Sequence, residues 1–255
     1  MISCNMDLIR KIKRKLVKLR LQPIRVLCFH EVSDNVMDES PDWMPLNAFK
    51  KHLQELQREG CVFVSLEDAR QHLKRDIFRF RKYVVLTADD GLRCQYDLLP
   101  WLVANRIPIT MFLNPNSLEQ IGCGKPYRVW FNVATKSQDE VLAKQLYMSR
   151  EEWIKIYDSH ISFACHGIKH DKSAVEMQID QFEDNVVECM NYLAKHPRFV
   201  PFYAYTYGSH SPRTDDVVKQ KGLIPVLADG QKNYNDASCI HREILEYEYK
   251  KCLQK

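Results

Sequence analysis

Two adjacent carboxylates, Asp89 and Asp90, follow a largely apolar run at 84–88 and precede Gly91. Neighbouring side chains at a strand end point to opposite faces, so the two acids can take separate tasks. One can hold a metal ion while the other accepts a proton. Because Asp-Asp-Gly also suits an ordinary surface turn, its meaning depends on the rest of the chain.

Two histidines, His166 and His170, follow a second apolar run at 161–165. Imidazoles four residues apart can reach one metal ion from a helical turn or a tight loop. Together with one carboxylate from the Asp89–Asp90 pair they complete a set of two histidines and one acid. Such a set typically holds a catalytic divalent metal and leaves positions open for water and substrate.

A third segment, 202–208, is an aromatic strand-like run that ends at Gly208. The backbone amides of such a turn could face a developing oxyanion. The simpler alternative is an aromatic strand followed by a turn with no chemical role.

The elements that must position these residues alternate along the chain. Buried strands are expected at 24–29, 61–64, 83–87, 107–112, 161–165, 201–205 and 223–228. Helices are expected around the stripe Phe49, Leu53 and Leu56, after the capping pattern Ser149–Glu152, and over 175–193. The irregular region 118–148 is interpreted as an insertion or lid whose Tyr127, Trp130 and Tyr147 stack on a sugar or fill local core.

This alternation implies parallel strands, and about seven such units predict a closed or nearly closed β/α barrel. A doubly wound open sheet is the competing layout. In both folds ligands gather at the carboxyl ends of the strands. His30, Asp89, Asp90 and His166 each follow a strand-like run, which predicts one common site.

Composition narrows the class of protein. The 255 residues are 45% hydrophobic, with no apolar stretch long enough to cross a bilayer and no secretory signal at the N-terminus. The nine cysteines are scattered without a Cys-x-x-Cys pair, which favours reduced thiols and a cytoplasmic protein.

Positive charge is concentrated at the start of the chain. Residues 1–20 carry seven basic residues against one acidic residue, a net +6, so the total of +4 leaves −2 for the remainder. A nearly neutral body argues against nucleic acid as a partner. We therefore divide the chain into a basic amphipathic helix at 1–22, with apolar Leu8, Ile12, Leu16 and Leu19, and a single catalytic domain at 23–255. That helix either packs on the body or makes peripheral contact with an anionic membrane, on its inner face.

The order of these motifs resembles that of the polysaccharide deacetylase family, from about Arg25 to Tyr234. The matching segments are Cys28–Val32, Thr87–Gly91, Ile107–Phe112, the pair His166 and His170, and Tyr203–Gly208. The resemblance implies a distorted (β/α)7 barrel. It also implies metal-dependent hydrolysis of an acetyl group, usually from an N-acetylated sugar.

Roles carry over by position. The resemblance makes Asp89 the general base, Asp90, His166 and His170 the metal ligands, and the Tyr207 backbone amide the oxyanion donor. His241 weakly resembles the family's late histidine and is a candidate general acid, with His30 and His210 as other candidates. In our assignment His30, Tyr205 and His210 contact the substrate.

The sequence also departs from the family pattern. Ala88 replaces a phenylalanine, Gly167 a serine or threonine, and Thr206 a proline. Neither an arginine in the third motif nor a late Asp-x-x-Asp-Trp segment is evident. The metal triad survives these changes, whereas the general acid and the substrate stay open.

The expected function is therefore a metal-dependent deacetylase acting on an N-acetylated sugar, as a glycan or as a lipid- or nucleotide-linked precursor of a surface polysaccharide. Zinc is the expected ion, and cobalt, nickel or manganese would suit the same ligands. The alternatives are an O-deacetylase, another amide or acyl hydrolase on this scaffold, or a glycan-binding pseudoenzyme.

Overall fold

A computed structural model of the chain describes residues 22–34, 43–75, 81–120, 127–129, 133–135 and 146–253. The helix predicted at the N-terminus, and with it the domain boundary at 22, lies outside these residues. So does Trp130 of the predicted lid. No helix of the described part is long and apolar enough to cross a membrane.

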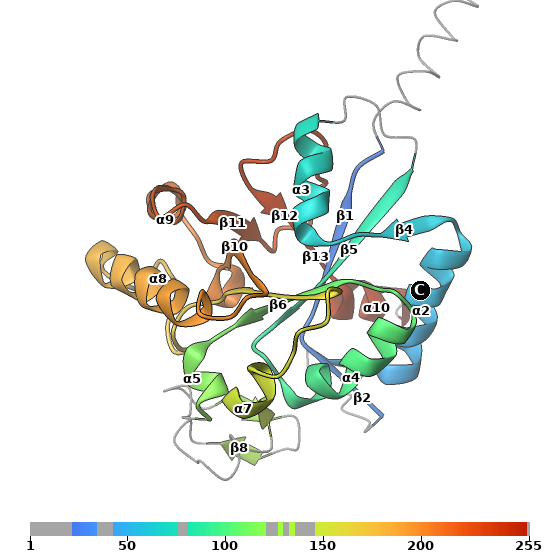
Figure 1. Ribbon diagram of the computed structural model, residues 1–255, viewed down its shortest axis with the longest axis horizontal. Coiled ribbons are helices and arrows are strands. Elements are labelled where there is room, and N and C mark those ends of the chain that lie inside the picture. Colours follow the sequence, from blue (N-terminus) through green and yellow to red (C-terminus); the bar gives the residue numbers. More distant parts are fainter. Residues whose placement is uncertain are drawn as a thin grey trace, which may run out of the picture.

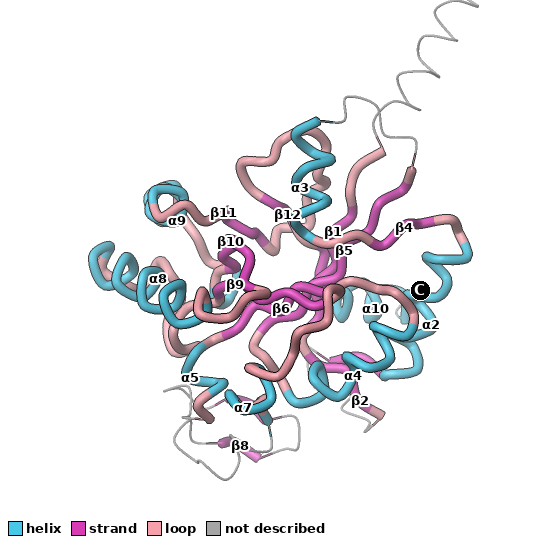
Figure 2. The backbone as a smooth tube through the Cα atoms, in the orientation of Figure 1, coloured by secondary structure: helices cyan, strands magenta, loops and turns pink. Residues whose placement is uncertain are grey.

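Parallel strands form a ring at the centre of the molecule, with helices around it (Figures 1 and 2). In ring order the strands are β1 (Arg25–Phe29), β5 (Lys82–Asp89), β6 (Ile109–Leu113), β9 (Ile161–Cys165), β10 (Phe199–Ala204), β11 (Ile224–Leu227) and a last, split strand. That last strand consists of β12 (Ile240–His241) and β13 (Glu243–Ile244). The strand β4 (Cys61–Phe63) pairs with β5 beside the ring.

The split strand closes the barrel. Its first half pairs with β11 and its second half pairs with β1, both in parallel. Arg242 lies between the halves, and its backbone N–H donates to the carbonyl of Leu227 at 2.7 Å. The ring is continuous, so the prediction of a distorted (β/α)7 barrel in one domain is confirmed and the open sheet is excluded.

Helices cover the outside of the barrel (Figure 1). The longer ones are α2 (Leu46–Arg58), α4 (Arg93–Ala104), α8 (Ile179–Leu193), α9 (Pro212–Gln220) and α10 (Leu245–Leu253). Unlike these, α3 (Leu66–Arg75) packs against the apolar residues inside the barrel. The predicted stripe of Phe49, Leu53 and Leu56 is buried on α2. The predicted capping box at Ser149 opens α7 (Arg150–Trp153), and α8 begins four residues later than its pattern suggested.

Shorter elements connect these parts. They are β2 (Glu31–Ser33) paired with β3 (Trp43–Pro45), the antiparallel pair β7 (Tyr127–Val129) and β8 (Val133–Thr135), α5 (Pro115–Leu118) and the 3-10 turn η1 (Thr206–Gly208). Every cysteine in the described ranges is a free thiol.

Strand alternation divides the apolar residues into two layers. On β5, Leu86 and Ala88 pack outward with residues of α2, α4 and α8, whereas Val85 joins a second cluster inside the barrel. Leu66, Ala69 and Leu73 of α3 pack into this inner cluster. Toward the carboxyl ends the inward positions turn polar, so the functional groups lie at that end of the barrel.

Candidate metal and catalytic site

The structure brings Asp90, His166 and His170 together at the carboxyl ends of β5 and β9. The Asp90 Oδ1 atom lies 3.3 Å from His166 Nε2 and 3.6 Å from His170 Nε2. One potential ligand atom from each residue lies within 4.8 Å of the others. Both histidines thus present Nε2 to the same carboxylate oxygen, as three ligands of one ion would.

A tight turn separates the two aspartates. Asp90 has φ +78° and Gly91 has φ +70°, so two successive residues adopt the left-handed conformation. This conformation is strained for a residue with a side chain, and such strain persists where surrounding structure imposes it. At Gly91 an added Cβ would also lie 2.9 Å from a methyl carbon of Leu113. The turn leaves Asp89 inside the barrel and directs Asp90 toward the histidines.

Hydrogen bonds behind the histidines fix their orientation. His166 Nδ1 lies 2.9 Å from the carbonyl oxygen of Ala204, which as an acceptor selects the tautomer protonated at Nδ1. The unprotonated Nε2 is then the atom that faces Asp90, as metal ligation requires. The buried amide of Asn114 donates to the carbonyls of His166 and Gly167 at 2.6 and 3.0 Å and holds the loop between the histidines.

Electrostatics also suit a cation at this position. Burial acts to raise the pKa of Asp90, but His170 and His166 outweigh it and hold this pKa well below its usual range. Burial lowers the pKa of His170, which favours the neutral imidazole. One ionised carboxylate and imidazole nitrogens are the donor set that binds zinc and similar divalent ions, so these residues fit the predicted metal.

Asp89 forms a buried, bidentate ion pair with Arg242. The two guanidinium nitrogens donate to the two carboxylate oxygens at 2.6 and 2.8 Å, and both residues are at most 3% exposed. Burial alone would raise the pKa of Asp89, yet Arg242 outweighs it and lowers this pKa. The carboxylate therefore stays ionised and fixed in direction.

Arg242 was not predicted from the sequence, because an arginine partner for Asp89 was expected in the third motif, the segment 202–208. The partner comes instead from the last strand, where Ile240 and Arg242 occupy alternate, inward positions. The strand segments on either side of Arg242 are only two residues long, too short for their alternation to be recognised in the sequence.

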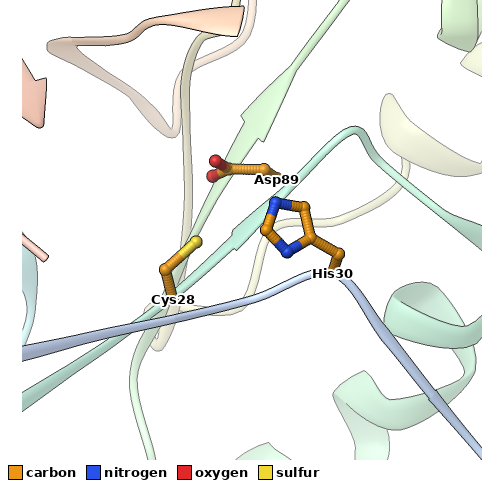
Figure 3. A group of neighbouring side chains, drawn as sticks. All are labelled: Cys28, His30 and Asp89. Carbon is orange, nitrogen blue, oxygen red and sulfur yellow. The ribbon is translucent and has the colours of Figure 1, made fainter. Parts of the chain in front are cut away.

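His30 lies on the same inward face as Cys28 and close to Asp89. One atom from each of the three side chains lies within 4.8 Å of the others, and Figure 3 shows them pointing toward one another. The fully buried Glu246 of α10 accepts the backbone N–H of His30, and one of its oxygens lies 3.5 Å from the ring Nδ1. Burial alone would lower the pKa of His30, but Glu246, Asp90 and Asp89 raise it to about 10. The ring is therefore a proton donor at neutral pH.

A second residue missed from sequence, Gln95, ties two parts of the site together. Its side-chain amide donates to the carbonyls of His30 and Asp89, at 2.8 and 2.5 Å. Gln95 is fully buried at the start of α4. The carboxyl ends of β1 and β5 are thus held in a fixed relation by one side chain.

Tyr207 lies in the turn η1, beside the second histidine. Its backbone is left-handed, with φ +59° and ψ +13°. Its hydroxyl donates to the carbonyl of His170 at 2.9 Å, and its ring meets the His170 ring edge-on at a centroid distance of 4.3 Å. These contacts place the Tyr207 turn next to the predicted metal ligands, while half of the residue stays exposed.

The structure does not bring His241 into this group. Alternation along the last strand sends Arg242 inward and His241 outward, on the side where Glu243 pairs with Arg25 at 2.7 Å. There the His241 Nδ1 atom lies 2.8 Å from Asp229. The structure thus places His241, predicted as the general acid, apart from the metal ligands, and it places His30, another predicted candidate, beside Asp89.

Tyr205 and His210 are also placed away from the predicted metal ligands. Tyr205 points outward, 2% exposed, stacks on Phe182 and donates its hydroxyl to Asp215 at 2.7 Å. His210 Nδ1 lies 3.1 Å from the same carboxylate. A buried ring committed to Asp215 has no free face for a sugar, so the substrate contact predicted for Tyr205 does not fit the structure.

A barrel with an Asp-His-His set and a separate Asp-Arg pair at its carboxyl end defines a class of hydrolase, and comparison with known proteins identifies the family. The model of the family described as polysaccharide deacetylase matches residues 79–226. The chain belongs to the polysaccharide deacetylase family. This is a family of carbohydrate deacetylases, so the predicted resemblance is confirmed.

Solved structures with the same fold include IcaB from Ammonifex degensii, with a TM-score of 0.68 and 20% identity over 88% of this chain and 91% of that chain. The BpsB deacetylase domain from Bordetella bronchiseptica has a TM-score of 0.66 and 16% identity, covering 88% and 96%. The deacetylase PplD from Streptococcus pyogenes, in complex with acetate, has a TM-score of 0.65 and 18% identity, covering 91% and 97%. A search of curated proteins finds no match.

Proposed function

We propose that this protein is a metal-dependent deacetylase that removes an acetyl group from an N-acetylated sugar. One observation carries the proposal: the cluster of Asp90, His166 and His170 lies directly beside the ionised Asp89 held by Arg242. The first group suits a cation, and the second suits a base. The choice of an N-acetyl group draws on a neighbour of the same fold, 19% identical, described as a de-N-acetylase from Aggregatibacter actinomycetemcomitans.

In this mechanism Asp90, His166 and His170 would hold the divalent ion. When bound, the ion supplies a Lewis acid that polarises the acetamide carbonyl and makes a water molecule easier to deprotonate. Asp89 takes the proton from the attacking water, and Arg242 keeps its carboxylate ionised and aimed. The Tyr207 backbone N–H stabilises the negative charge that develops on the carbonyl oxygen.

His30 donates the proton to the leaving amine. It lies on the inward face beside Asp89, and Glu246 holds it from behind. Hydrolysis of an amide requires a base for the attacking water and an acid for the leaving amine, and Asp89 and His30 would supply these two groups. Asp89 receives one hydrogen of the consumed water, and the other leaves with the acetic acid product. His30 supplies the new N–H of the amine, and transfer of the proton from Asp89 to His30 then restores both groups.

The proposal is tested by acetate release. The full chain, reconstituted with zinc, cobalt, nickel or manganese, is incubated with an N-acetylglucosamine oligomer and with a matched O-acetylated oligosaccharide. We expect acetate from the N-acetyl substrate only with metal present, and release slower by roughly 10²–10⁴-fold from Asp89→Asn. Release from the O-acetyl substrate alone would replace the proposal with an O-deacetylase. No release from either substrate, by a protein that binds the metal, would count for a glycan-binding pseudoenzyme.

A further inference from the structure

On the outer face of the barrel, away from the proposed metal, three side chains form a linear hydrogen-bonded series. Cys239 Sγ lies 3.5 Å from His241 Nε2, and His241 Nδ1 lies 2.8 and 3.0 Å from the two oxygens of Asp229. Cys239 directly precedes β12 (Ile240–His241), and its sulfur lies beside the ring of His241. This is the order nucleophile, base and orienting carboxylate.

The surroundings hold this series in place. Gln231 donates its backbone and side-chain N–H groups to Asp229, at 3.1 and 2.8 Å. The buried Asn233 accepts the backbone N–H of His241 at 2.9 Å and donates to its carbonyl at 2.7 Å. The carboxylate of Asp229 and the backbone of His241 are thus each held by a neighbouring side chain.

The carboxylate determines the tautomer of the ring. Asp229 is an acceptor, because its pKa lies below the usual range through the Gln231 and His241 hydrogen bonds, which outweigh its burial. His241 Nδ1 must therefore carry the proton, and Nε2 is left as an acceptor aimed at the thiol. In this tautomer Nε2 can accept the proton of Cys239.

The thiol of Cys239 requires a base, because its pKa is raised. Burial and the nearby Asp236 raise the pKa of Cys239, against the opposing effects of Ser238 and Lys219. A thiol of raised pKa is a poor nucleophile unless a base removes its proton during attack. Cys239 is half-buried, and a small disulfide is therefore the class of reagent that suits it best.

We propose that Cys239, His241 and Asp229 form a reactive thiol site that takes up small disulfides. His241 Nε2 removes the thiol proton as the Cys239 sulfur attacks one sulfur of the disulfide. The old S–S bond breaks, a mixed disulfide forms at Cys239, and the departing thiolate receives the proton from His241. Cys239 is oxidised and the small disulfide is reduced.

A disulfide suits this site better than an acyl group does. Attack on a carbonyl builds an oxyanion that needs its own donors, whereas attack on a disulfide sulfur does not. The nucleophile and its base are the groups that the cluster supplies.

The test measures the rate at which oxidised glutathione adds to each cysteine of the full chain, by peptide mass spectrometry. Cys252, exposed on α10, is the internal reference. We expect Cys239 to react faster than the more accessible Cys252, and Cys239→Ser to remove the fast addition. His241→Gln should slow Cys239 by roughly tenfold or more, and Asp229→Asn should slow it less, with Cys252 unchanged.

A pH series separates base catalysis from simple disturbance of the strand. If His241 acts as the base, the rate of addition to Cys239 differs widely between wild type and His241→Gln near neutral pH. This difference in rate becomes smaller at higher pH, where the thiol ionises without a base. A difference in rate that stays constant with pH would overturn the proposal. So would a Cys239 that reacts no faster than Cys252, or an unchanged rate in His241→Gln.

Discussion

At the scale of single residues, Asp89 and Asp90 show how two neighbouring carboxylates come to differ. The left-handed turn at Asp90 and Gly91 sends one acid to an arginine and the other to two histidines. Chemically equal side chains therefore acquire different partners. Their roles should separate on substitution.

We expect Asp90→Ala to lose the metal and Asp89→Asn to keep it. Asp89→Asn removes only the proton acceptor, so its turnover should fall by roughly 10²–10⁴-fold at unchanged metal content. Metal content by plasma mass spectrometry and acetate release check the two variants together. Loss of metal from Asp89→Asn would contradict the division of roles.

His30 and His241, the two histidines considered for the general acid, also have different partners in the structure. His30→Ala should lower turnover by roughly 10²–10⁴-fold, because it removes the imidazole that lies beside Asp89 and is proposed to protonate the leaving amine. His241→Ala, the matched control from the outward face, should retain turnover within a few-fold. Acetate release at pH 7 measures both variants. A larger loss in His241→Ala would restore the assignment made from the sequence.

Residue types and spacing predicted Asp89, Asp90, His166 and His170, since each follows a strand-like run and strand ends meet at one edge. Gln95, Arg242 and Glu246 could not be predicted in the same way. Gln95 and Glu246 act from helices, and their hydrogen bonds depend on how those helices pack against the barrel. Arg242 acts across the barrel interior, from a strand distant in the sequence.

At the scale of elements, the last strand joins barrel closure to catalysis. Arg242 divides β12 from β13, and its side chain crosses the interior to Asp89. The two halves of this strand, β12 and β13, are two residues each, too short for a strand's alternation of apolar and polar residues to be seen in the sequence. For that reason the sequence predicted β/α alternation but not how the ring closes.

We expect Arg242→Met to lower the free energy of unfolding by about 3–5 kcal/mol, because it leaves the Asp89 carboxylate buried without its partner. Arg25→Met on the outer side is the control. Its ion pair with Glu243 is partly exposed and should contribute about 1 kcal/mol or less. Urea unfolding followed by circular dichroism measures both values. Equal losses in the two variants would contradict the argument.

The short helix α7 is held by a pH-sensitive contact. The carboxylate of Glu152 caps Ser149 and pairs with Arg93 of α4, and Arg93 chiefly lowers its pKa to about 2, against its burial. The folded pKa lies below the ordinary value of 4.5, so the pair stabilises the fold above that pH. Its contribution is lost as pH falls from 4.5 toward 2.

Glu152→Gln should therefore be less stable than the wild type at pH 7 and equally stable near pH 2. The additional free energy of unfolding of the wild type should disappear between pH 4.5 and 2, as Glu152 takes up its proton. Urea unfolding at a series of pH values gives the two curves. A difference that persists at pH 2 would show that packing, rather than charge, makes α7 sensitive to this residue.

At the scale of the whole molecule, the proposed ion would link residues that follow two strands, β5 and β9, that are not neighbours in the barrel. Asp90 follows β5, whereas His166 and His170 follow β9, with β6 between them in the ring. These ligands meet only in the folded chain, so the ion binds the folded state and not the unfolded one. Metal binding and barrel stability are then coupled by mass action.

Removal of metal with a chelator should consequently lower the melting temperature. At a free metal concentration about 100 times Kd, the ion adds about 2.7 kcal/mol to the free energy of unfolding. For a domain of this size that corresponds to a shift of roughly 5–10 °C, measured by differential scanning calorimetry before and after zinc is restored. Asp90→Ala should melt at one temperature with or without zinc, whereas Asp89→Asn should keep the zinc-dependent shift. A zinc-dependent shift that survives in Asp90→Ala would place the ion elsewhere in the barrel and remove the basis of the proposed mechanism.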